Sequence, residues 1–111
     1  MKEYNYVKIQ YKNEIKDWPI IHLAELNEER FEVRAIDIYQ NNGYGYANTH
    51  VECNSFLSDC TFPIVSEFYN SNKYDLDEAD YYDITKEEFE TEWKKALEYC
   101  NIHNMIPRVL P

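Results

Sequence analysis

The spacing at which apolar residues recur changes along the chain, and this change constrains the fold more than any other feature. Near the start, Val7, Ile9 and Tyr11 are separated by polar residues. A period of two is typical of a strand with one buried face. The clearest period of 3.6 residues comes late in the chain, as one apolar stripe of an amphipathic helix. That stripe consists of Phe89, Trp93, Ala96, Leu97 and Cys100.

Signals for helix ends support the second pattern. Thr85 comes just before the stripe and Glu88 lies three residues after Thr85, which is the spacing of a capping box. Asn101 suits the C-cap of the same helix. Pro63 suits the first turn of a shorter helix over residues 63–70.

Between these patterns, apolar runs at residues 18–26 and 31–40 predict further strands. Pro19 fits the start or edge of the first run, because it has no N–H to donate to a neighbouring strand. The apolar parity changes midway through the second run, which predicts a β-bulge or a strand covered on both faces. "NNG" at 41–43 predicts a hairpin turn, since Asn and Gly tolerate positive φ. A return strand and another short strand follow.

Strands come first and the clear helix comes last, so we predict an α+β fold. We expect an antiparallel β-sheet of about four to six strands, then a short helix and a C-terminal amphipathic helix packed on one side. The chain of 111 residues fits one domain over 1–111. Residues 71–83 read as a polar, acidic loop, and the apolar tail after Cys100 is expected to pack back on the sheet.

Catalytic and metal-binding motifs are not evident. His22, His50 and His103 lie far apart, without the spacing of a zinc site. The chain has three cysteines, and an odd number without a secretion signal favours free thiols. "GYG" at 43–45 is too short for a phosphate-binding loop. We therefore expect no enzyme, no catalytic residue, no metal and no cofactor.

Charge narrows the possible partners. With 21 acidic and 11 basic residues the formal net charge is −10, which disfavours direct binding of nucleic acid. Such a chain attracts basic partners and accelerates the encounter with them. The N-terminus has no signal-peptide pattern, and no apolar run approaches the roughly 20 residues of a membrane helix. We expect a cytoplasmic protein with no membrane contact.

Acidic residues and tyrosines are concentrated before the last helix. Nine acids lie between Asp75 and Glu92, opposed only by Lys86. Tyrosine supplies contact area at low entropic cost and carboxylates pair with arginine or lysine, so this segment suits a protein interface as well as it suits a solvated loop. The predicted contact residues are Tyr74, Asp75, Asp77, Glu78, Asp80, Tyr81, Tyr82 and Asp83.

A second charged stretch lies in "ERFEVR", residues 29–34. Glu32 and Arg34 share a parity, which predicts that they project from one face and pair with each other or across strands.

Several motifs together resemble a family of small bacterial proteins described as a domain of unknown function. They are "YVKI" at 6–9, "DWP" at 17–19, "ELNEERFEVR" at 25–34 and "ITKEEFETEW" at 84–93. Proteins of this kind resemble immunity proteins of contact-dependent inhibition and other polymorphic toxin systems. The resemblance implies an inhibitor that binds a cognate toxin C-terminal domain, in many cases a nuclease such as an RNase A-like enzyme, and it implies no catalytic residues.

A basic nuclease cleft would accept an acidic protein as a phosphate mimic, with tyrosines as anchors. Two alternatives stay open. One is a small ligand-binding domain or enzyme, in which His22 or His50, Arg34 and a carboxylate converge in a deep pocket. The other is an acidic regulator that mimics DNA.

Overall fold

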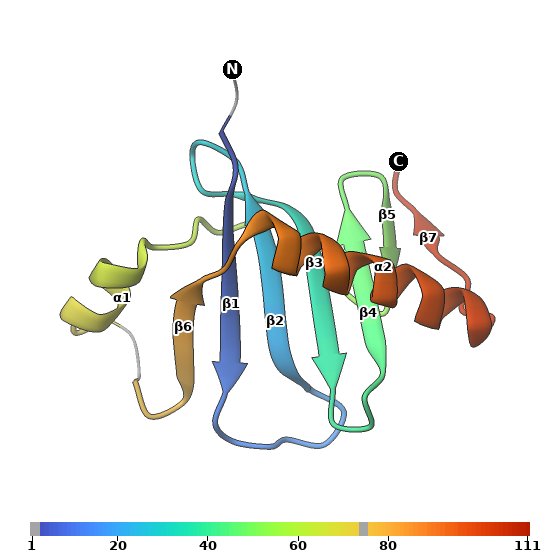
Figure 1. The fold of residues 1–111 in the computed structure, drawn as a ribbon, viewed down its shortest axis with the longest axis horizontal. Helices are drawn as coiled ribbons and strands as arrows, with labels where there is room; N and C mark the ends of the chain where they lie inside the picture. Colours follow the sequence, from blue (N-terminus) through green and yellow to red (C-terminus); the bar gives the residue numbers. More distant parts are fainter. Residues whose placement is uncertain (1–2, 74–75) are drawn as a thin grey trace.

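The structure is a computed structural model that describes residues 3–73 and 76–111. These residues form seven strands and two helices (Figure 1). In chain order they are β1 (Asn5–Tyr11), β2 (Pro19–Leu26), β3 (Glu32–Tyr39), β4 (Tyr44–Asn48), β5 (Val51–Cys53), α1 (Val65–Asn70), β6 (Ala79–Asp83), α2 (Lys86–Ile102) and β7 (Arg108–Val109).

All seven strands belong to one antiparallel sheet, in the order β6-β1-β2-β3-β4-β5-β7. Strands β1 to β5 follow one another as a meander, β6 returns to pair with β1, and β7 pairs with β5 at the other edge (Figure 1). The predicted α+β fold with an antiparallel sheet is confirmed. The strand number exceeds the expected four to six, because residues 79–83 form β6 where a loop was predicted and the tail contributes β7.

Helix α2 crosses one face of the sheet (Figure 1). Its predicted cap is confirmed, since the Thr85 side chain accepts a hydrogen bond from the Glu88 N–H at 3.1 Å. Phe89, Ala96 and Cys100 of the predicted stripe are buried against the sheet. The predicted C-cap is wrong: the helix continues through Asn101 and is capped by the next turn, where His103 N–H bonds Tyr99 O.

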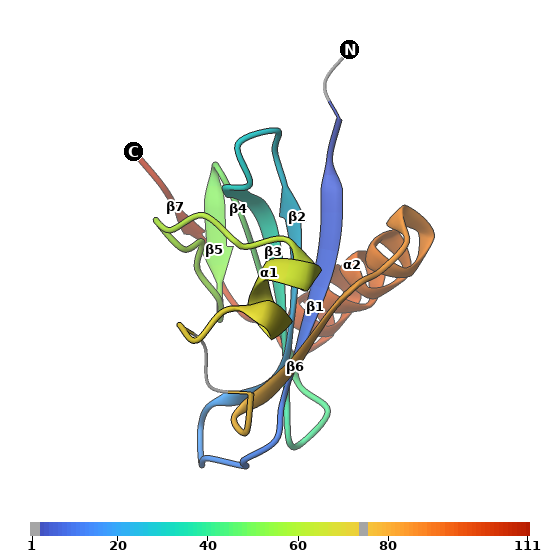
Figure 2. The ribbon, with the colours of Figure 1, turned by 90° about the vertical axis from the view of Figure 1, so that its left-hand side faces the viewer.

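Helix α1 lies on the opposite face of the sheet, so the two helices do not share one side (Figure 2). Val65 and Phe68 of α1 pack with Phe62 onto a second core. The buried members of that core come from β1, β2 and β6, and are Val7, Ala24, Leu26 and Tyr81. Because both faces are covered, the inner strands carry apolar side chains at consecutive positions.

The change of apolar parity in β3 lies between Ala35 and Ile36, where the pairing with β2 is regular and both residues are fully buried. Of the two predicted explanations, a strand covered on both faces therefore holds at this point.

A bulge lies earlier in β3, at Val33. Glu25 pairs with Arg34, but Leu26 pairs with Glu32, so Val33 is an extra residue. Because of the inserted residue, the side chains before it point to the opposite face of the sheet from the one that regular alternation would give. Glu32 and Arg34 therefore face opposite sides of the sheet, and the predicted pair between them is wrong. The alternative, a pair across strands, holds for Arg34, whose guanidinium bonds Glu25.

None of the helices in the described part of the chain is long and apolar enough to cross a membrane.

Candidate functional site

A histidine between two carboxylates lies on the α1 face of the sheet. His22 of β2 pairs in register with Asp37 of β3, and the bulge turns Glu32 towards the same ring. The His22 Nδ1 lies 2.6 Å from Asp37 and its Nε2 lies 2.5 Å from Glu32. The His22 side chain is 13% exposed, that of Asp37 is 9% exposed, and that of Glu32 is fully buried.

The remaining carboxylate oxygens tie the loop after β5 to this cluster. The Ser55 hydroxyl donates to Asp37 at 2.7 Å, and the Ser58 N–H donates to Glu32 at 2.6 Å. The Phe62 ring stacks on the imidazole with its centroid 6.3 Å away. Loop 54–64 is therefore held over the sheet by polar groups that would be costly to bury alone.

The charge state of His22 decides what the cluster can do. Burial acts to lower the His22 pKa, but the hydrogen bonds to Asp37 and Glu32 outweigh it and raise the pKa from 6.5 to about 10. The ring is an imidazolium at neutral pH, and both N–H groups donate. It has no free nitrogen with which to accept a proton, activate a nucleophile or bind a metal.

A cavity of about 550 Å³ opens above this cluster. We call it the His22 cavity. Its volume lies within the range of small-molecule and side-chain pockets. Aromatic side chains line it, namely Tyr11, Trp18, Tyr39, Phe56 and Phe62. Trp18 and Phe56 are 64% and 70% exposed, which is unusual for side chains with this much apolar area.

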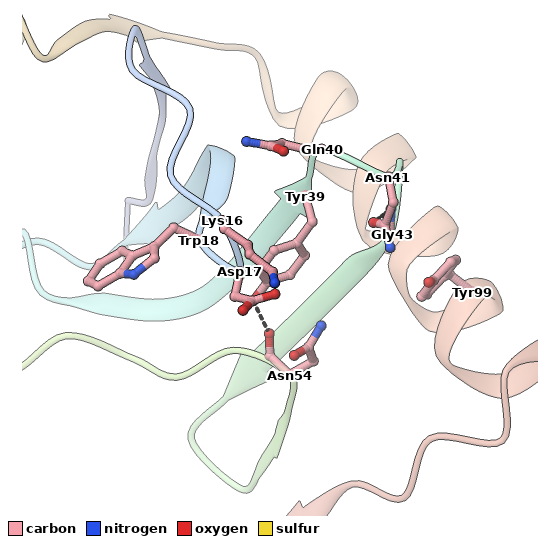
Figure 3. Close-up of a pocket in the computed structure, with 9 residues that line it drawn as sticks. All are labelled: Lys16, Asp17, Trp18, Tyr39, Gln40, Asn41, Gly43, Asn54 and Tyr99. Atoms are coloured by element: carbon pink, nitrogen blue, oxygen red, sulfur yellow. Dashed lines mark hydrogen bonds between the residues drawn. The ribbon is translucent and has the colours of Figure 1, made fainter.

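Two smaller cavities adjoin the His22 cavity. One of about 360 Å³ shares Asp17, Trp18, Tyr39 and Asn54 with it (Figure 3). There the Tyr39 hydroxyl donates to the Asn54 carbonyl at 2.7 Å, which fixes the wall between the two (Figure 3). The other, of about 210 Å³, is lined by Trp18 and also by Ile15 and Glu78. Trp18 thus borders all three hollows.

The loop between β1 and β2 carries both Trp18 and Asp17. Asp17 has φ 68°, a left-handed conformation that Asp tolerates better than most residues. In residues 3–73 and 76–111 its carboxylate makes no hydrogen bond or ion pair. Figure 3 shows Asp17 beside Tyr39 and Asn54, at the wall that the two larger cavities share.

The predicted contact residues are only partly exposed. Tyr74 and Asp75 lie outside the described residues. Exposed positions are held by Asp77, Glu78, Asp80, Tyr82 and Asp83. Tyr81 is a correction: it is 2% exposed and its hydroxyl donates to the Pro63 carbonyl at 2.6 Å, so it is a core residue. The cause is the alternation of β6, which turns Tyr81 towards α1.

The acidic segment borders the Trp18 loop. Lys12 donates to the Leu76 carbonyl at 2.9 Å and lies 3.6 Å from Asp80. Glu78 lines the third cavity with Trp18. Glu78, which was among the predicted contact residues, thus lines the same cavity as Trp18, which was not. The prediction placed Trp18 in the strand over 18–26, but β2 begins at Pro19 and Trp18 belongs to the β1–β2 turn.

Arg34 belongs to the opposite face. Its guanidinium donates to both Glu25 oxygens, at 2.7 and 2.9 Å, and also to Glu90 of α2. Its carbon Cζ lies 4.8 and 4.9 Å from the Phe89 and Trp93 ring centroids. The hydrogen bond to Glu25 is the main cause that raises the Arg34 pKa above its ordinary value. Arg34 therefore anchors α2 and does not converge with His22, and neither does His50, which is exposed in the β4–β5 turn.

The three cysteines differ in their exposure. Cys53 and Cys100 are buried and Cys60 is exposed, all as free thiols. Burial raises the pKa of Cys100 to about 12, which keeps it protonated. Within residues 3–73 and 76–111 no group of three or more His, Cys, Asp or Glu side chains is arranged to hold a metal ion.

One comparison with known proteins identifies a family. The model of a family described as a domain of unknown function, DUF6881, matches residues 5–98, and the chain therefore belongs to that family. No curated protein and no solved structure matches the chain.

Proposed function

We propose that this member of the DUF6881 family is a cytoplasmic inhibitor that binds and neutralises a basic protein domain, as an immunity protein does with its cognate toxin. The observation that carries the proposal is Trp18, which is 64% exposed at the meeting point of three cavities. An exposed tryptophan with hollows on its sides is typical of the anchors that dominate protein interfaces.

The composition of the surrounding surface supports a protein partner. Aromatic and apolar side chains lie in the middle, with Trp18, Phe56 and Ile15 all more than half exposed. Acidic residues such as Glu78 lie at the margin. An apolar centre with a polar rim is the usual anatomy of a specific interface.

Charge supports a basic partner. The net charge of −10 favours association with a positively charged domain through long-range attraction. A nuclease domain fits this requirement, because its cleft must hold phosphates. A toxin nuclease, in particular an RNase, is therefore the partner class that we propose, with its active site occluded by the acidic and aromatic surface.

The state of His22 supports binding over catalysis. Both ring nitrogens are already used, at 2.6 and 2.5 Å from carboxylates, and the ring carries its proton at neutral pH. An acid–base or nucleophilic mechanism needs such a ring with one nitrogen free.

The test uses each basic domain encoded by a gene adjacent to that of this chain, with the nuclease activity of the domain and its binding to the chain measured together. We expect stoichiometric inhibition. Trp18→Ala should weaken binding by about 2 kcal/mol or more, roughly thirtyfold, because a central anchor is lost. Ile106→Ala is the matched control, since Ile106 is 91% exposed in the tail before β7. The proposal would be contradicted if none of these domains bound the chain. It would also be contradicted if Trp18→Ala and Ile106→Ala weakened binding equally.

A small-ligand site is the second candidate, favoured by the volume of the His22 cavity, about 550 Å³. The alternative of a ligand-binding domain or enzyme required a histidine, Arg34 and a carboxylate in one pocket. The His22 cavity contains the histidine and carboxylates, but Arg34 lies on the opposite face of the sheet. Native mass spectrometry of the protein as isolated from cells would distinguish the two. A tightly bound small molecule that leaves on Trp18→Ala would favour this candidate.

A further inference from the structure

The carboxylates that line the His22 cavity outnumber the cations that line it. Its charged lining residues are three carboxylates and one imidazolium, from Asp17, Glu32, Asp37 and His22. None of the described residues that line it is a lysine or an arginine. The adjoining cavity, in contrast, contains Lys16. The His22 cavity therefore has a net negative lining, about two charges, beneath aromatic walls.

The carboxylates have different roles in the cavity. Glu32 and Asp37 are already bonded to His22 and to the loop, and their side chains are 0% and 9% exposed, so they act on an occupant mainly through their field. Asp17 is exposed and lies at the wall beside Tyr39 (Figure 3). It is the group that can bond an incoming cation directly.

The walls add a second preference. Trp18, Tyr11 and Tyr39 present ring systems in the same hollow as the Asp17 carboxylate. Aromatic faces attract cations, and a planar guanidinium also stacks on them and forms two parallel hydrogen bonds with a carboxylate. An ammonium group has only the first of these interactions.

From this combination we infer that the His22 cavity receives an arginine side chain of the partner, with the guanidinium bonded to Asp17 and stacked against Trp18 or Tyr39. The inference rests on the proposed inhibitor function, because the partner is the source of the arginine. The partner would then be recognised through a protruding arginine, which the aromatic and acidic side chains of the cavity bind.

The test titrates the full chain with a short peptide, acetyl-Gly-Arg-Gly-amide, and follows the two tryptophan indole N–H signals by NMR. The matched peptide has citrulline in place of arginine, which keeps the shape and removes the charge. We expect saturable shifts of the Trp18 signal with the arginine peptide, no response to the citrulline peptide, and no change at Trp93, which belongs to α2 and packs against the core on the opposite face of the sheet.

A variant then locates the contact. Asp17→Asn should weaken binding of the arginine peptide about tenfold, because a charge-assisted hydrogen bond is lost. Glu98→Gln, an exposed acid on α2, should leave the affinity unchanged. Equal response to the citrulline peptide, no saturation, or an unchanged affinity in Asp17→Asn would overturn the inference.

The peptide titration does not use the partner, so its result is independent of whether the inhibitor function holds. If Trp18→Ala abolishes capture of the toxin domain while Asp17→Asn has no effect on the domain or on the peptide, the proposed function stands and the arginine pocket is wrong.

Discussion

His22 shows how one side chain can have a structural role that resembles a catalytic one. A histidine between Asp37 and Glu32 looks like an acid–base site when only residue types are compared. The distances of 2.6 and 2.5 Å and the near-complete burial show a charged network in which the imidazolium offsets two acids that could not be buried alone. The cluster thereby holds loop 54–64 over the sheet.

This role predicts a particular dependence of stability on pH. The folded pKa of His22, about 10, lies above its ordinary value of 6.5, so the stabilising contribution is fully present below about pH 6.5 and is lost as the pH rises through 10. Between these values the native state holds one more proton than the unfolded state. The free energy of unfolding should fall by about 1.4 kcal/mol per pH unit in that window from this group alone.

Urea unfolding between pH 6 and 10 measures this dependence, with His22→Gln as the reference that lacks the titrating group. The difference in free energy of unfolding between the two proteins should be largest near pH 6 and should shrink towards pH 10. A difference that is constant over the range would show that His22 is not a cation in the folded protein.

The β3–β4 hairpin contains the glycine pair that resembles a ligand loop in the sequence. Asn42 has φ 63° in the turn, and the Gly43 N–H is bonded to the Asn41 side chain at 2.8 Å. A Cβ on Gly45 would lie 2.0 Å from the Asn54 carbonyl oxygen. Gly45 is therefore required by close approach of two backbone segments, and it belongs to packing and not to a ligand cradle.

Alanine at the two glycines should therefore give different results. Gly45→Ala meets backbone atoms that cannot move without distorting β4 and β5, so it should cost more than about 2 kcal/mol of stability. Gly43→Ala meets the side chains of Asn41 and Tyr99, at 2.7 and 2.9 Å, which can rotate away. Thermal unfolding of both variants tests this, and equal destabilisation would contradict the reasoning.

The elements with a long and regular pattern were predictable from the sequence. Helix α2 and its Thr85 cap have local signals, because each depends on residues a few positions apart. The bulge in β3 does not, since it lies at Val33 and not at the parity change between Ala35 and Ile36. Strand β6 was missed because its apolar positions, Ala79 and Tyr81, are separated and surrounded by acids. Strand β7 has two residues and forms only because β5 offers an open edge.

The His22 cluster depends on the register in which β2 and β3 pair, and this register could not be read from the sequence. Asp37 meets His22 because β2 and β3 pair in one alignment, and Glu32 joins them only after the bulge reverses its parity. Both acids look unremarkable in the printed sequence. Trp18 was assigned to a strand, because an apolar run follows it. Its position among three cavities comes from loops 12–18 and 54–64 meeting in space.

The two faces of the sheet differ in how completely the helices cover them. On one face α2 closes the sheet and is held by Arg34 through Glu25 and Glu90. On the other face α1 covers the part near β1 and β6 (Figure 2). Beside it lies the His22 cavity, where Trp18 and Phe56 are exposed. An open face beside a closed one suits a protein that presents a rigid surface to a partner.

The acidic segment should contribute mainly to the rate of association. Asp77 and Glu78 are exposed beside the Trp18 loop. Asp77→Lys with Glu78→Lys therefore reverses the field at the surface proposed to meet a basic partner. The matched control is Glu28→Lys with Glu29→Lys, two exposed acids in the β2–β3 turn at the other end of the sheet (Figure 1). Both pairs raise the net charge by four, so only the position of the charge differs.

Stopped-flow association with the toxin domain at low and high ionic strength separates these effects. We expect the wild-type rate to fall steeply with salt, and the Asp77–Glu78 variant to associate about tenfold more slowly at low salt with little change in dissociation. Above a few tenths molar salt the rates should converge, because the Debye length falls below the separation of the surfaces. If the Glu28–Glu29 variant slows association equally, net charge alone attracts the partner and the acidic segment has no special position in the encounter.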